Sequence, residues 1–414
     1  MFRVRLDLAA RFLRFSSYAE SPAVRRSIPG MPEPTLAFLS KQKLHLRRDG
    51  VTRMVESEFE RTVRERAASI ERRHAWKTQG RGAAFMHGVW ATEANGHNAV
   101  PVLWTGLTAG PDGSLFYSME TDAVSGIFLL DAAGVETRLF HTADFHIRHA
   151  AIHPSGATLA VSVFHTDSAR SNIAVLPVHG TDFQEVTEGD SFDQSPSWVP
   201  GVRRRIIFQS GGIGRDASGR FAGLGPCTIQ SLDLDTGDLE EVAGEQGHDL
   251  LQPRQTADGT LYYIRKPYES GVPAASVLGS LKDAALFPFR MARAVFQYCN
   301  LFSMMYTGKP LVSGKGAMHR RMDPRQMFIH GNLAQAQAPQ AGDEAQSLVP
   351  GSWELIRRAP GGQTETVAKK VLAFDLAADG SVYCSDGSAI TRIRSRGSAE
   401  RLVQAEMIDR VLAL

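Results

Sequence analysis

The sequence contains little cysteine and no long hydrophobic run, and both absences exclude whole classes of protein. Its 414 residues include only 3 cysteines. These are widely spaced and form no Cys-x-x-Cys pair, which excludes a disulfide framework and a cysteine-based zinc site and predicts a reducing compartment. The most apolar uncharged stretch, residues 294–308, is shorter than the roughly 20 residues that cross a bilayer. We therefore expect neither a disulfide-stabilised fold nor a transmembrane helix.

The first residues lack the continuous apolar segment of a secretory signal, because charged residues recur from Arg3 to Arg14. Apolar and charged residues alternate over residues 2–8, which fits either a short strand or an amphipathic helix. We therefore expect a protein that is not exported and that works in the cytoplasm, either free or attached peripherally to a membrane surface.

The net charge is only +2, but it is unevenly distributed. Residues 1–82 hold 18 Lys and Arg against 9 Asp and Glu, whereas the remainder holds 28 against 35. Such a basic segment either binds an anionic partner or docks on the acidic body of its own chain, and we favour the second. Nucleic-acid binding usually adds stacking aromatics or a known motif, and only Trp76 is available here, so nucleic acid is not a predicted partner.

A repeated turn is the clearest positive feature. Proline or alanine, aspartate or serine, and glycine recur in one frame, once in shortened form, at Pro111–Gly113, Pro154–Gly156, Pro200–Gly201, Ala257–Gly259 and Ala378–Gly380. Glycine supplies the positive φ that a tight hairpin requires. A short apolar strand leaves each turn, beginning at Leu115, Leu159, Ile206, Leu261 and Val382. Third strands (127–131, 229–233) and fourth strands (137–140, 239–242) often follow.

The spacing of the turns predicts blades of a propeller. Glycines 113, 156 and 201 are 43 and 45 residues apart, the length of one four-stranded blade. We therefore predict an all-β fold, a six-bladed β-propeller with an N-terminal amphipathic helix and a helical insertion in the fourth recognisable blade. Five repeats are visible, and residues 408–414 look like an innermost strand without its blade. We expect residues 83–104 to supply the missing partners, so that the ring closes by pairing both ends.

One blade also resembles a known repeat. Asp193–Gly201, followed by Arg205–Phe208 and Ile229–Thr236, is similar to the WD-like repeat of the TolB family. That unit runs as an acidic residue, Pro-Ser-Trp-Ser-Pro-Asp-Gly, an apolar strand, and a strand closing in Asp-Leu-Asp-x-Gly; here Gly201 follows Pro200 directly. The resemblance covers residues 105–268 and 352–414. It implies a β-propeller that takes part in protein–protein interaction.

Three segments are expected: a basic N-terminal arm over 1–82, a propeller over 83–414, and within it an insertion over 269–350. In the arm, residues 51–76 have helical periodicity, with Val55, Phe59 and Val63 on one apolar face. We expect this helix to pack on the propeller, the alternative being an arm for a partner. A glycine-rich loop at 211–225 lengthens one blade.

The insertion contains an unusually apolar helical pattern. Pro288 separates its two predicted segments, and from Phe289 to Tyr306 the polar residues form one narrow stripe, so most of the helix surface must be buried. The propeller itself, the interface of a bilayer, and a partner or second copy of the chain all remain open. The predicted contact residues are Phe287, Phe289, Val295, Phe296, Leu301, Phe302 and Met305. Residues 332–349 predict a flexible return linker.

Motifs of catalysis are scarce. The sequence has no Gly-x-Ser-x-Gly nucleophile elbow, and Gly211–Asp216 lacks the Gly-Lys-Ser/Thr ending of a phosphate loop. His149 and His153 would be metal ligands on a helix, but the repeat places them on a strand and its turn. We therefore predict no catalytic residue, no cofactor and no metal.

The expected binding site is the mouth of the central channel, where the innermost strands begin. By alignment of the repeats it is lined by Arg148, His149, Asp193, Gln194, Gln252, Arg254, Asp375, Asp409 and Arg410. The sequence thus predicts a non-enzymatic scaffold for a protein or peptide partner. The alternative is a propeller enzyme, of hydrolase or lyase type, that uses channel residues such as His149 and Asp193. The oligomeric state is not predicted.

Overall fold

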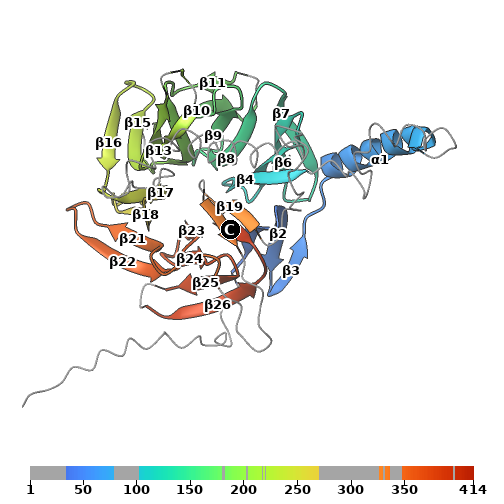
Figure 1. Ribbon diagram of the computed structural model, residues 1–414. Helices are drawn as coiled ribbons and strands as arrows, with labels where there is room; N and C mark the ends of the chain where they lie inside the picture. Colours follow the sequence, from blue (N-terminus) through green and yellow to red (C-terminus); the bar gives the residue numbers. More distant parts are fainter. Residues whose placement is uncertain are drawn as a thin grey trace, which may run out of the picture.

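The strands form sheets that stand side by side around a central axis, as the blades of a propeller do (Figure 1). The computed structural model describes residues 34–78, 102–179, 182–201, 204–216, 218–219, 221–269, 326–329, 332–335, 347–394 and 397–414. Within these residues nearly every element is a β-strand, and one helix accompanies them. The predicted β-propeller is therefore confirmed as the fold class.

Consecutive strands pair antiparallel in the order that the repeats predict. The first repeat gives β4 (Leu103–Ala109), β5 (Leu115–Glu120), β6 (Ser125–Leu130) and β7 (Glu136–Thr142). The second gives β8 (His146–Ile152), β9 (Thr158–His165), β10 (Arg170–Pro177) and β11 (Gln184–Glu185). The third gives β12 (Ser191–Trp198), β13 (Arg205–Arg215), β15 (Thr228–Asp233) and β16 (Leu239–Ala243). A single parallel bridge between Ser171 and Phe192 joins β10 to β12.

Two further sheets follow the same plan. One consists of β17 (His248–Gln255), β18 (Leu261–Pro267), β21 (Glu354–Arg358) and β22 (Thr364–Lys369). The other consists of β23 (Ala373–Leu376), β24 (Val382–Ser385), β25 (Ala389–Ile393) and β26 (Ala399–Gln404). The turn glycines have the predicted left-handed conformation, with φ of 80° at Gly113, 76° at Gly156 and 85° at Gly259. The local part of the repeat is thus confirmed.

The last sheet joins the two ends of the described chain. β27 (Ile408–Ala413) pairs antiparallel with β1 (Leu36–Ser40), and β2 (Lys43–Arg48) and β3 (Val51–Met54) complete the sheet. Closure by both ends is as predicted, but the choice of residues 83–104 as the partner of β27 was wrong. Residues 103–109 form β4 of the neighbouring sheet instead. Three strands of the closing sheet therefore lie within the range 1–82 that we expected to form an arm.

Apolar side chains fill the spaces between neighbouring sheets. One buried cluster joins Ala151 and Ala160 of the second repeat to Trp198, Ile206 and Phe208 of the third. Another joins the closing sheet to the first repeat through Leu39, Leu44, Trp104, Tyr117 and Phe128. Each sheet therefore depends on its neighbours for the burial of its faces, as expected for a ring of repeats.

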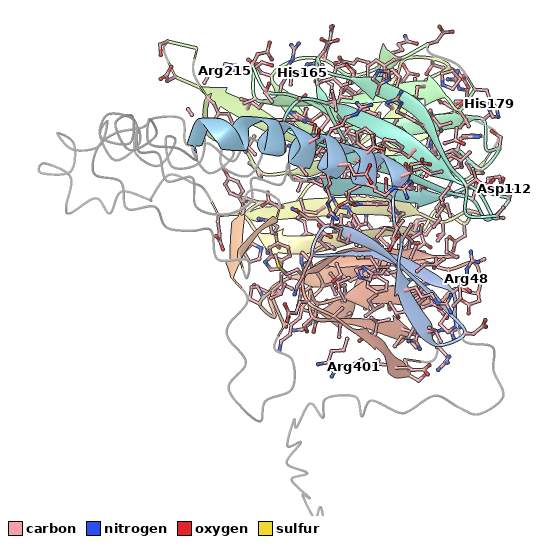
Figure 2. The ribbon with its side chains drawn as sticks, turned by 90° about the vertical axis from the view of Figure 1, so that its right-hand side faces the viewer. Arg48, Asp112, His165, His179, Arg215 and Arg401 are labelled. Carbon is pink, nitrogen blue, oxygen red and sulfur yellow. The ribbon has the colours of Figure 1, made fainter. Side chains whose placement is uncertain are left out.

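The helix α1 (Glu58–Thr78) begins later than predicted, because residues 51–54 form β3. Ser57 caps it, since its Oγ accepts a hydrogen bond of 3.1 Å from the amide of Glu60. The carboxylate of Glu60 is buried and accepts a hydrogen bond of 3.2 Å from Trp104 Nε1, and Phe59 packs on Phe128 with ring centroids 5.0 Å apart. Val63 of the next turn packs against the same buried cluster, so the start of the helix packs on the propeller as expected. In Figure 1 the helix then extends outward from the ring, and in the turned view of Figure 2 it crosses in front of the blades.

The two other departures from the repeat differ from expectation in part. The glycine-rich segment predicted as a loop forms the end of β13 and β14 (Phe221–Leu224), and Arg215 Nη2 lies 2.6 Å from Asp190 Oδ1. The insertion does fall between β18 and β21 of one sheet. Its described part is a hairpin of β19 (Gln326–Ile329) and β20 (Asn332–Gln335), so the start of the predicted linker is a strand.

The other predictions for the insertion concern residues that lie outside the described part of the chain. These include its predicted contact residues Phe287, Phe289, Val295, Phe296, Leu301, Phe302 and Met305. The same holds for the apolar helical pattern of residues 277–306. In the part of the chain that the structure does describe, no helix is long and apolar enough to cross a bilayer.

Candidate functional site

The innermost strands of all the sheets described above surround a cavity at the centre of the ring. It is lined by residues of β4, β8, β12, β17, β23 and β27, and its empty volume is about 460 Å³, part of which is open solvent. Four predicted residues, His149, Gln252, Arg254 and Arg410, line this cavity. Ser195, which we did not predict, lines it as well.

Three neighbouring inner strands carry a β-bulge at the cavity. In β8 the pairing with β9 skips His149, in β12 the pairing with β13 skips Ser195 and Pro196, and in β17 the pairing with β18 skips Gln252 and Pro253. The bulged residues His149, Ser195 and Gln252 have φ of 43°, 51° and 51°. A bulge turns the side chain out of the regular alternation of the strand, here toward the channel.

The conformation of these bulges is strained. Left-handed φ is unusual for residues with a side chain, and the ring of a following proline disfavours helical conformations of the residue before it. Both conditions apply to Ser195 and to Gln252. Such positions cost on the order of 1–3 kcal/mol each and persist where the surrounding structure fixes them.

Hydrogen bonds fix two of the three bulges. The hydroxyl of Ser162 donates to the carbonyl of Arg148 (2.8 Å) and lies 2.8 Å from Nδ1 of His149. Because this hydroxyl has a single proton, Nδ1 of His149 is the donor in that contact. Gln252 is held through its amide N–H, which donates to Gln209 Oε1 (2.9 Å), and through Nε2, which donates to the carbonyl of Leu372 (3.1 Å).

Ser195 differs from the other two. Its residue is only 6% exposed, and its Oγ is buried without a hydrogen-bond partner among the described residues. A buried hydroxyl without a partner costs about 1–3 kcal/mol. The hydroxyl of Ser195 is therefore available to a ligand at the cavity.

Charged groups from three strands meet at the same cavity. Nε of Arg254 lies 3.7 Å from Oδ1 of Asp375, whose Oδ2 accepts a hydrogen bond of 2.9 Å from the amide of Ala413. Nη1 of Arg410 donates to the carbonyl of Asp409 (2.9 Å). Burial raises the pKa of the Asp375 and Asp409 carboxyls. Burial also lowers the pKa of Arg410, and the positive charge of Arg254 adds to that shift.

The other predicted residues lie next to the cavity lining and have partners within the fold. The Asp193 carboxylate accepts a hydrogen bond of 2.7 Å from Ser210, and burial raises its pKa. The guanidinium of Arg148 lies over the ring of Phe164, 4.6 Å from its centroid, and its Nε is 3.7 Å from Glu120. Gln194 is buried opposite Gln209. Alignment of the repeats thus selected four residues that line the cavity, but it did not identify which residues of each strand face it.

The histidine pair separates as expected. His149 lines the cavity, whereas His153 belongs to the turn, where its Nδ1 lies 2.8 Å from Ser155 Oγ and its ring meets Trp198 edge-on. Among the described residues, no group of three His, Cys, Asp or Glu side chains is placed to hold a metal ion.

A signal for Ser195 was present in the sequence. Ser195-Pro196 and Gln252-Pro253 are X-Pro pairs at the same position of successive repeats, in strands that otherwise read as regular. Because proline cannot donate to the ladder, it is expected only at edges or bulges of a sheet. Two such prolines in register predict a bulge at the inner end of each blade.

Comparisons with known proteins agree with a β-propeller fold and do not identify a function. No family model matches the chain, and no curated protein matches it. Among solved structures it is similar to TolB from Acinetobacter baumannii (11% identity, TM-score 0.49, covering 93% of this chain and 68% of that one). It is also similar to the nidogen/laminin complex (8%, 0.48, 92% and 97%) and to oligogalacturonate lyase in complex with manganese (12%, 0.37, 91% and 75%).

Proposed function

We propose that the protein is a six-bladed, non-enzymatic β-propeller that binds a peptide segment of a partner protein at the mouth of its central channel. The number of blades follows from counting each repeat as one blade and the closing sheet as the sixth. On this division every blade contributes its innermost strand to the cavity, which supports a binding site shared by the whole ring.

The observation that carries the proposal is the unused hydroxyl of Ser195 on a strained backbone at the cavity. No described residue compensates for the missing hydrogen bond, and both the strain and the missing bond are destabilising. A ligand that hydrogen-bonds to this hydroxyl would compensate for part of that loss. A peptide suits the site because its main chain offers both donors and acceptors.

The non-enzymatic part of the proposal rests on the partners of the two groups that an enzyme would use. Asp193 is engaged with Ser210 of the third repeat, while His149 is engaged with Ser162 of the second. Each side chain is therefore held within its own repeat. An enzyme that used them as an acid–base pair would lose its turnover in a His149→Ala/Asp193→Ala variant, which gives the alternative its own test.

The proposal extends to location and attachment. The protein works in the cytoplasm, and the insertion predicted over 269–350 supplies a second contact, with a partner or with a membrane surface. Co-sedimentation with liposomes, compared between the intact chain and a chain without residues 272–310, tests this part. Binding by the intact chain alone supports membrane attachment, whereas no binding by either chain removes it and leaves the partner contact.

Peptide binding is tested by selection from a random library displayed on phage, with the immobilised full-length chain as target. Peptides enriched on the wild type should bind the Ser195→Ala variant more weakly, and the exposed outer-strand control Arg138→Ala equally well. Ser195→Ala removes a hydroxyl with no partner in the fold, so it should fold normally. The proposal fails when no peptide is enriched, or when the enriched peptides bind His149→Ala, Ser195→Ala and wild type alike.

A further inference from the structure

We propose that the channel mouth recognises a carboxylate of the bound peptide, through the guanidinium groups of Arg254 and Arg410 and the hydroxyl of Ser195. This inference rests on the proposed function and adds the chemical class of the ligand to it. The three side chains come from β17, β27 and β12, which lie far apart in the sequence, and all three line one cavity.

The two arginines form a local concentration of positive charge. Both line the same cavity, Arg410 is desolvated there while Arg254 keeps 31% of its side chain exposed, and the charge of Arg254 acts on Arg410 against the opposing charge of Asp409. Like charges held together at low solvent exposure repel each other unless an anion lies between them. An anionic ligand group at this point would therefore be stabilised by both.

Within the described part of the chain, Arg254 and Arg410 use only part of their hydrogen-bonding capacity. A guanidinium has five N–H donors in a fork that matches a carboxylate. The contact of Arg254 Nε with Asp375, at 3.7 Å, is longer than a hydrogen bond, and Arg410 uses Nη1 for the carbonyl of Asp409. Each guanidinium therefore still has N–H groups that can donate to a ligand carboxylate in the bidentate arrangement.

The neighbouring acidic groups are consistent with exchange for a ligand. Asp375 already accepts the amide of Ala413, and burial raises the pKa of Asp375 and of Asp409, so that their charged forms are disfavoured. Neither carboxylate makes the short bidentate pair with an arginine that would satisfy both. A ligand carboxylate would therefore compete at Arg254 with the 3.7 Å ion pair to Asp375, and not with a short bidentate pair.

Ser195 supplies the third donor. Its hydroxyl is buried at the cavity and has no partner among the described residues, and its left-handed backbone fixes its position. A hydroxyl beside two guanidinium groups is a donor to an anion and needs no conformational change to serve as one. The same three donors would serve a glutamate or aspartate side chain and the terminal carboxylate of a peptide.

The test uses three fluorescein-labelled peptides built on one Gly-Ser spaced sequence, with fluorescence anisotropy as readout. The first carries glutamates and a terminal amide, the second carries glutamines and a free terminal carboxylate, and the third carries glutamines and an amide. We expect the first or the second to bind the full-length chain at least about tenfold more tightly than the third. Which of the two binds tells side-chain recognition from recognition of the chain end.

Arginine variants then locate the carboxylate. Arg254→Gln and Arg410→Gln should each weaken the better peptide by about tenfold, Ser195→Ala by about threefold, and the exposed control Arg138→Gln should have no effect. Thermal melting confirms that each variant folds. Ser195→Ala keeps the test decisive if an arginine variant does not fold, because it removes no hydrogen bond of the native state.

The outcomes separate the inference from the function on which it rests. Equal binding of all three peptides, or binding that is insensitive to both arginine substitutions, overturns carboxylate recognition. If peptides from the displayed library bind at the channel and none of the three probes does, carboxylate recognition is likewise wrong while peptide binding stands.

Discussion

The hairpin turns and the inner strands use the same left-handed backbone conformation in two different ways. At the turns, glycine occupies it, as at Gly113 and Gly259, where no strain arises. At the channel, His149, Ser195 and Gln252 occupy it, and each carries a side chain that makes the conformation costly. At the channel the fold therefore accepts the strain of a side chain in a conformation that glycine would adopt more easily.

The inner strands also carry hydrogen bonds that hold neighbouring sheets together. Thr105 Oγ1 donates to the carbonyl of Ile147 (2.9 Å), and Gln252 Nε2 donates to that of Leu372 (3.1 Å), each from one inner strand to the segment of the next sheet. A buried backbone carbonyl needs such a partner. Side chains at the inner end thus serve both packing and the site, whereas a turn residue such as His153, whose ring meets Trp198 of the next repeat, lies outside the cavity lining.

The largest effect is expected where an inner strand packs on its neighbour. Trp198→Ala should lower the free energy of unfolding by about 3–5 kcal/mol, because it opens a cavity in a buried cluster and removes the hydrogen bond of 3.0 Å from Nε1 to the carbonyl of Ala151. Chemical denaturation measures this loss. The exposed turn residue Val135 is the control, and Val135→Ala should change stability by less than about 0.5 kcal/mol. Equal losses would contradict the contrast between the inner ends and the turns.

A smaller loss is expected at a turn. A Cβ at Gly113 would meet nothing within 4 Å, so Gly113→Ala should cost only the left-handed conformation, about 1–2 kcal/mol. Gly212→Ala is the matched control, because Gly212 also faces open space but does not have a left-handed φ. Thermal melting of both variants is the measurement, and a destabilised Gly212→Ala beside an unchanged Gly113→Ala would show that conformation is not the cause.

At the channel the sign of the effect should reverse. Ser195→Gly relieves the left-handed strain and removes a buried hydroxyl without a partner, which together outweigh the greater flexibility of glycine in the unfolded chain. We expect a gain of about 0.5–1 kcal/mol in unfolding free energy, with weaker peptide binding. Gln252→Gly has the same φ but loses its side-chain bond to Leu372, so it should be less stable than wild type. A Gln252→Gly variant more stable than wild type would show that backbone strain alone determines the change in unfolding free energy.

The smallest effect concerns pH. Burial raises the folded-state pKa of Asp193, so its charge destabilises the fold above that pKa, and stability rises as the pH falls through it toward the unfolded value of about 3.9. At the turn, the hydrogen bond from Thr256 lowers the pKa of Asp258, so the stability that this carboxylate adds is lost only below about pH 4. Asp193→Asn should therefore reduce the gain in stability as the pH falls from neutral toward about pH 4. The exposed Asp122→Asn variant is the control, and identical pH profiles for the two variants would contradict the assignment.

The fold was predictable from sequence as far as its signals were local. The turns at Gly113, Gly156 and Gly259 and the strands that leave them need only neighbouring residues, and the structure confirms them. The closing sheet needs a partner for β27 from the other end of the chain. The turn between β1 and β2 is made by Lys41 and Gln42, with φ of 50° and 56°. Neither residue type is typical of such a turn, so the sequence did not predict it.

Part of what was missed did have a sequence signal. Asp49-Gly50, between β2 and β3, is a typical hairpin turn, and Ser57 followed by Glu60 is a capping box that fixes the start of α1. Of the site, the strand starts were predictable from the repeat, whereas the facing of Ser195 depends on a bulge that shifts the alternation by one residue. Position along a strand is a local property, but the direction of a side chain at a bulge is set by pairing.

The closing sheet also sets the order in which the ring can be completed. The hydroxyl of Ser40 in β1 donates to the carbonyl of Glu406, 366 residues away in sequence. Leu36 and Phe38 of the same strand are buried in a cluster with residues near the other end of the chain, such as Ile408 and Val411. During synthesis these apolar side chains cannot reach their native burial until nearly all of the described chain has been made. Completion of the ring is thus the most non-local event of folding and is expected to be slow. A nascent chain that stalls before β27 would expose an unpaired strand edge, which makes such fragments natural clients of chaperones.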